Sequence, residues 1–149
     1  MNEHNQWLRN EKMAASSEFL AATERLVNSE LQSRSPRVLA NAVQEARNLS
    51  HARLTLVCPM DVASSALKLR ESVVDVATLL AERSRIGPDE AWDEQVNGAF
   101  AKAYRSKIQF VLESSKDLNS GIFKGLGPFR AITMSMLRWK VRLWEKKLV

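Results

Sequence analysis

Four prolines divide this chain into pieces of similar length, at positions 36, 59, 88 and 128 of its 149 residues. Proline is tolerated in the first turn of a helix, but it breaks a helix interior and pushes the preceding residue out of helical geometry. Glycine is also scarce, with five in the whole chain, so few other residues interrupt the pieces between the prolines. The pattern predicts helices that start close to Pro36, Pro59, Pro88 and Pro128, with another helix before Pro36.

Sequence signals beside the prolines indicate where these helices start and stop. Ser35 followed by Pro36 is typical of an N-cap residue and the first helical position. Pro59 with Asp61 marks a second start, because an acid in the first turn complements the helix dipole. Gly87 is typical of the glycine that ends one helix shortly before the next. The joints are therefore short, and consecutive helices are expected to run antiparallel.

Each of the first four pieces carries apolar residues at alternating steps of three and four, which is the spacing of one helix face. The third piece has the most regular set: Val62, Ala66, Leu69, Val73, Val76 and Leu80. The other sets are Leu8, Ala15, Phe19, Ala22 and Leu26 in the first piece, Leu39, Ala42, Ala46, Leu49 and Leu56 in the second, and Trp92, Val96, Ala99, Ala103 and Phe110 in the fourth. Lys12 and Arg53 fall within the first and second sets as polar residues.

These patterns predict an all-α protein of one domain, residues 1–149, with an antiparallel up-down-up-down four-helix bundle over residues 5–118. The second helix is expected to run without a break from Pro36 past Leu56, with His51 inside it. A linker over residues 119–127 and a basic amphipathic helix over residues 128–149 complete the predicted architecture.

Side chains that usually carry catalysis or bind metals are few. The chain has two histidines, His4 and His51, and one cysteine, Cys58, and they do not have the spacing of a zinc site. His51 and Cys58 are seven residues apart. That separation is about 10 Å along a helix, too far for a nucleophile and its base. We therefore predict a non-enzymatic protein with no catalytic residue, metal, cofactor or small-molecule substrate.

The positive charge of the chain is concentrated in residues 121–149. That segment has seven basic residues against one acid, Glu145, for a net charge of +6, whereas residues 1–120 have 15 basic and 16 acidic residues. On a helical projection of residues 128–149, Phe129, Ile132, Met136, Trp139 and Leu143 form one face. The candidate interaction surface is the basic and tryptophan-containing stretch of Arg138, Trp139, Lys140, Arg142, Trp144, Lys146 and Lys147.

This basic segment has several interpretations. We favour a fifth helix that packs its apolar face on the core and lets its last turns protrude. A helix at an anionic membrane surface ranks next, and nucleic-acid binding ranks below it, because no reader motif is present. An unknown protein partner or self-association is the remaining interpretation.

We predict an interaction or scaffold protein of the cytoplasm that is peripheral to the cytoplasmic membrane face through its basic C-terminal helix. No signal peptide or membrane span is expected, because residues 1–15 are polar and charged and no run of about 18 uncharged apolar residues occurs. The alternative prediction is a nucleic-acid-binding protein that uses the same segment.

Residues 4–12 (HNQWLRNEK), followed by residues 17–22 (SEFLAA), resemble the opening of a group of uncharacterised bacterial proteins, most familiar from actinobacteria. The resemblance extends over residues 4–118 and includes the proline-containing joint at residues 58–62 (CPMDV). It implies a helical bundle in a bacterial protein and no known activity or catalytic residues. In that group a single N-terminal membrane helix commonly comes first, and this chain departs from the group in lacking it.

Overall fold

The structure is a computed structural model, and it describes residues 3–87 and 89–119. The described residues form α1 (Glu3–Asn28), the 3₁₀ turn η1 (Glu30–Gln32), α2 (Pro36–Arg47), α3 (Ala52–Val57), α4 (Met60–Ile86) and α5 (Glu90–Asn119). No strand occurs in these two ranges. The prediction of an all-α protein is therefore confirmed.

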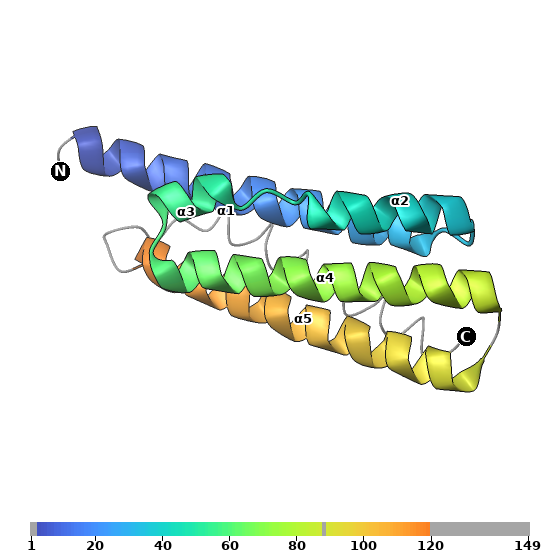
Figure 1. Cartoon of the computed structure of the whole chain (residues 1–149). Helices are drawn as coiled ribbons and strands as arrows, with labels where there is room; N and C mark the ends of the chain where they lie inside the picture. Colours follow the sequence, from blue (N-terminus) through green and yellow to red (C-terminus); the bar gives the residue numbers. More distant parts are fainter. Residues whose placement is uncertain (1–2, 88, 120–149) are drawn as a thin grey trace.

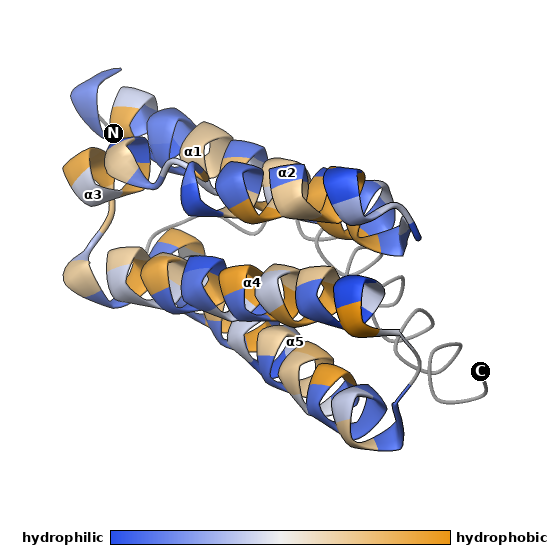
Figure 2. Cartoon of the chain, turned by 45° about the vertical axis from the view of Figure 1, so that its right-hand side comes forward, coloured by the Kyte–Doolittle hydropathy of each residue, from blue (hydrophilic) through white to orange (hydrophobic). Residues whose placement is uncertain are grey.

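The long helices lie alongside one another, and the chain reverses direction between α1 and α2, between α3 and α4, and between α4 and α5 (Figure 1). α4 has its most extensive contacts with α5 on one side and α2 on the other, while α1 contacts α2, α3, α4 and α5. α3, the start of α4 and the end of α5 lie at one end of the molecule, which we call the α3 end, and the start of α1 projects past it (Figure 1). Hydrophobic and hydrophilic residues alternate along each helix, as expected for helices with one buried face (Figure 2).

The helix ends follow the signals in the sequence. Ser35 is the N-cap of α2, where its side chain accepts a hydrogen bond from the backbone N–H of Val38 at 3.5 Å, and Pro36 is the first helical residue. Gly87 ends α4 with a φ of +100°, a left-handed conformation that favours glycine. The backbone N–H of Gly87 donates to the carbonyl of Arg83 at 2.9 Å. These local contacts therefore start α2 at Pro36 and end α4 at Gly87.

The core forms where the predicted apolar faces meet. All six residues of the regular set in α4 are buried, from Val62 to Leu80. Phe19 of α1 and Phe110 of α5 pack edge to face, with ring centroids 5.4 Å apart. Removing an apolar side chain of this size from water contributes about 1.5–3 kcal/mol to folding. The buried apolar faces therefore hold together helices that are distant in the sequence.

The prediction of one continuous second helix is wrong. α2 ends at Arg47, α3 begins at Ala52, and the residues between them are not helical. Asparagine and serine, which occur in this break, favour turns because their side chains compete for backbone hydrogen bonds. The break shifts the helical register, so Leu54 is buried with 1% exposure and Leu56, expected in the core, is 85% exposed.

Candidate functional site

The predicted interaction surface lies outside the residues that the structure describes. This applies to Arg138, Trp139, Lys140, Arg142, Trp144, Lys146 and Lys147, and equally to the predicted linker and C-terminal helix. Functional candidates in the described helices therefore come from the polar groups that the fold brings together.

Polar residues within the apolar helix faces form ion pairs between helices. Lys12, noted above as a polar position in the first helix, lies with its Nζ 3.2 Å from Oδ1 of Asp117 on α5. The two side chains are only 20% and 11% exposed. Partial burial strengthens such a pair relative to one at the surface, so it ties the start of α1 to the end of α5.

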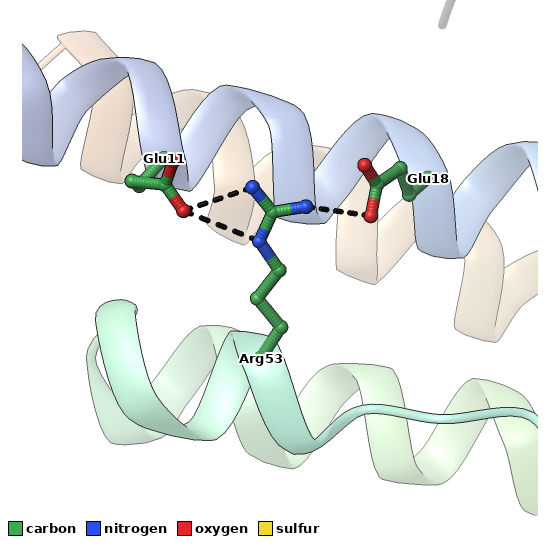
Figure 3. A network of polar contacts seen from close by, with 3 residues as sticks. All are labelled: Glu11, Glu18 and Arg53. Carbon is green, nitrogen blue, oxygen red and sulfur yellow. Dashed lines mark hydrogen bonds and ion pairs between the residues drawn. The ribbon is translucent and has the colours of Figure 1, made fainter.

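Arg53 joins α3 to α1 through two carboxylates (Figure 3). Its Nε and Nη2 donate to Oε2 of Glu11 at 3.3 and 2.8 Å, and its Nη1 donates to Oε2 of Glu18 at 2.7 Å. The hydrogen bonds to Glu11 and then Glu18 raise the pKa of the Arg53 guanidinium, which keeps its charge. The planar fork of arginine suits this contact. The cluster fixes α3 against α1, which is a structural role.

The most deeply buried charges are Lys107 of α5 and Glu24 of α1. The Nζ of Lys107 donates to Oε1 of Glu24, and the two side chains are 0% and 8% exposed. The pair was not predicted, although the position of Lys107 in the sequence points to it. Lys107 lies four residues after Ala103 and three before Phe110, so it occupies the open position of that apolar face.

A shallow basic groove lies between α4 and α5. It has a volume of about 230 Å³ and is lined by Ser65, Lys68, Lys102, Arg105, Ser106 and Gln109. The three cations Lys68, Lys102 and Arg105 form no ion pair with any described residue. Their charges remain available to an anionic group at this surface.

The polar side chains beside these cations are already engaged within the fold. The hydroxyl of Ser65 donates to the carbonyl of Val62 at 2.8 Å, and the hydroxyl of Ser106 lies 2.9 Å from that of Ser72. The amide of Gln109 donates to Glu113 at 2.8 Å. The groove therefore offers positive charge and no nucleophile with a partnered base.

Cys58 and His51 lie at opposite ends of α3, as its C-cap and N-cap residues. Burial, followed by the negative charge of Asp117, raises the pKa of the Cys58 thiol to about 11. A thiol with that pKa is protonated and unreactive at neutral pH. Nδ1 of His51 lies 3.3 Å from Nη1 of Arg70. The arrangement does not match a nucleophile and its base.

A carboxyl pair lies at the corner between α1 and α2. Burial raises the pKa of Glu30, on η1, to about 7, with further contributions from a hydrogen bond to Glu45 and from its negative charge, while Arg25 acts in the opposite direction. Oε2 of Glu30 is buried and has no hydrogen-bond partner. The carboxyl group of Glu30 is therefore protonated more readily than a solvent-exposed one.

The described residues contain no group of three or more His, Cys, Asp or Glu residues that could hold a metal ion. None of their helices is both long and apolar enough to cross a membrane.

Comparison with known proteins gave no match to any protein family, curated protein or solved structure.

Proposed function

We propose that this protein is a non-enzymatic interaction or scaffold protein whose basic C-terminal segment binds the anionic cytoplasmic face of a membrane. The separation of charge along the chain carries the proposal. Residues 1–120 hold 15 basic and 16 acidic residues, whereas residues 121–149 hold seven basic residues and one acid. Several charges of the described helices are used in ion pairs between helices, such as those of Arg53 and Lys107.

The proposed scaffold is an antiparallel four-helix bundle in which α2 and α3 together take the place of the second helix. Two observations support it: the contacts of α4 with both α2 and α5, and the reversal of the chain before α2, before α4 and before α5 (Figure 1). A basic amphipathic helix over residues 128–149 would extend this bundle.

The proposed membrane contact has two parts. Each Lys or Arg close to an anionic membrane contributes about 1 kcal/mol to the free energy of membrane binding. Trp139 and Trp144 supply aromatic rings that suit the headgroup region. Arg138, Arg142 and Lys146 follow one another at steps of four on one helical face, so they can contact the same lipid surface.

Co-sedimentation with lipid vesicles tests the proposal. The triple variant Arg138→Gln, Arg142→Gln and Lys146→Gln is expected to weaken binding to phosphatidylserine-containing vesicles roughly 100-fold, since three contributions of about 1 kcal/mol are lost. The control is Arg34→Gln with Arg37→Gln, two exposed cations among the described residues. Equal binding by the two variants, or equal binding to neutral phosphatidylcholine vesicles, would contradict the proposal.

A second candidate function is nucleic-acid binding. The groove of Lys68, Lys102 and Arg105 favours it, because these three cations are unpaired among the described residues and lie on one surface. Fluorescence anisotropy with a labelled duplex should then show affinity that falls steeply with salt. Replacing all three cations with glutamine should reduce the salt slope by about 3. An unchanged slope would exclude this groove as the contact.

A further inference from the structure

Three exposed hydrophobic residues lie at the α3 end of the molecule. Trp7 near the start of α1 is 54% exposed, Leu56 on α3 is 85% exposed and Met60 at the start of α4 is 81% exposed. We call these three residues the α3-end patch. Ile86, which is 55% exposed at the last residue of α4, lies at the opposite end. Exposed apolar residues gathered at one end of a molecule mark a surface that contacts something.

The Arg53 ion pairs hold α3, which carries Leu56, against the part of α1 that carries Trp7. Glu11 is one turn after Trp7 and on the same side of α1, and Glu11 binds Arg53 of α3. Leu56 is three residues after Arg53, and α3 runs opposite to α1 (Figure 1), so the chain runs from Arg53 toward the end of α1 that carries Trp7. Met60 follows shortly after α3 as the first residue of α4. The three residues therefore lie on elements that meet at the α3 end.

The chain continues from this same end. α5 ends at Asn119 beside α3 and the start of α4 (Figure 1), and residues 120–149 follow it. The eight residues 120–127 can span about 26–29 Å when extended. Residues 128–149 can therefore reach the α3-end patch, and their apolar face begins at Phe129.

The charges around the α3-end patch distinguish between its two candidate occupants, the basic segment and an anionic membrane. Glu3 and Asp61, next to Trp7 and Met60 respectively in the helices, are exposed. Glu11 and Glu18 add two carboxylates against the single cation Arg53. Arg9, two residues after Trp7, lies on the far side of α1 by helical spacing. An acidic border disfavours an anionic lipid surface and attracts a segment of charge +6.

We infer that the apolar face of residues 128–149 docks on the α3-end patch within the same chain. Phe129, Ile132 and Met136 would cover Trp7, Leu56 and Met60. The cationic side of the segment, with Arg138, Arg142 and Lys146, stays outward. The inference goes beyond the proposed function, because docking needs no membrane.

Hydrogen exchange of the full-length protein without lipid tests the docking. Leu56→Asp is expected to speed amide exchange in residues 128–149 at least tenfold and to lower Tm by about 4 °C, because a charge replaces a covered leucine. Ile86→Asp is the matched control at the opposite end and should leave that exchange unchanged. The inference is overturned if these amides exchange at unfolded-chain rates in the unaltered protein, or if Leu56→Asp does not change their exchange.

A variant on the other side of the contact distinguishes the occupants. Met136→Asp should have the same effect as Leu56→Asp, and the double variant should show little further change, because both disrupt one contact. Analytical ultracentrifugation should show a monomer. A dimer that dissociates on dilution together with loss of the protection would overturn docking within one chain. Failure of vesicle binding would count against the proposed function alone.

Discussion

Replacing Glu24 with leucine is expected to lower the free energy of unfolding by about 3–5 kcal/mol. The change leaves the ammonium group of Lys107 buried without its carboxylate, and isolated buried charges are costly. The Lys107 side chain is fully buried and that of Glu24 is 8% exposed, so water has little access to replace the lost partner. Domains of this size have a total free energy of unfolding of about 5–15 kcal/mol. Glu24→Leu is therefore expected to be marginally folded.

The reverse change and the double variant make the prediction specific to the pair. Lys107→Met should cost less than Glu24→Leu, because the Glu24 side chain keeps 8% exposure to water while that of Lys107 has none, so water can partly solvate the carboxylate that is left. Glu24→Leu combined with Lys107→Met should recover most of the loss, since apolar residues of similar volume often replace a buried ion pair at no cost. The sum of the two single effects on the free energy of unfolding should exceed the effect of the double variant by at least about 2 kcal/mol.

Urea unfolding followed by far-ultraviolet circular dichroism measures these differences, provided that the m-value is unchanged among the variants. Lys116→Met is the control, because Lys116 pairs with Glu113 while its side chain is 72% exposed. That change should stay within about 0.5 kcal/mol. The reasoning is refuted if Glu24→Leu costs less than about 1 kcal/mol, or if the two single effects simply add in the double variant.

Two further predictions concern the joints of the fold. Arg53→Lys should lower the free energy of unfolding slightly, because lysine cannot bridge Glu11 and Glu18 with a planar fork, and amide exchange in α3 should become faster as the contact loosens. Glu30→Gln should flatten the pH dependence of unfolding: the pKa of Glu30 is raised to about 7 in the folded state, so this group makes stability fall as pH rises from about 4.5 to 7. At pH 8 the variant should be more stable than the parent by about 1 kcal/mol after solvent screening. If the stability of the parent, relative to that of the variant, rises between pH 4.5 and 7, the raised pKa of Glu30 is contradicted.

Helix ends and the most regular buried face could be predicted from the sequence, because both depend on neighbouring residues. Ser35 and Gly87 act within one turn of the chain, through a side-chain cap and a left-handed backbone conformation. The apolar set from Val62 to Leu80 is buried throughout, since an uninterrupted helix keeps its register. Leu56 was not on the predicted face, because the short break before α3 shifted the register of that one helix.

The partners of the charged residues required the tertiary structure. Lys12 was visible in the sequence as a polar position in an apolar face, but nothing near it identified Asp117, 105 residues away. Lys107 and Glu24 are 83 residues apart, and their contact depends on how α5 packs against α1. Ion pairs form between groups that the fold brings close, and sequence spacing carries no information on that distance.

Local backbone preference explains why the helical nature of residues 3–87 and 89–119 and most of their helix ends follow from the sequence. Composition in the same way shows that the excess positive charge lies in residues 121–149. In contrast, the ion pairs in the core, and the presence of Trp7, Leu56 and Met60 on elements that meet where α5 ends, follow from the packing of the helices. Helix packing brings distant parts of the chain together, and that packing depends on the complementarity of whole faces.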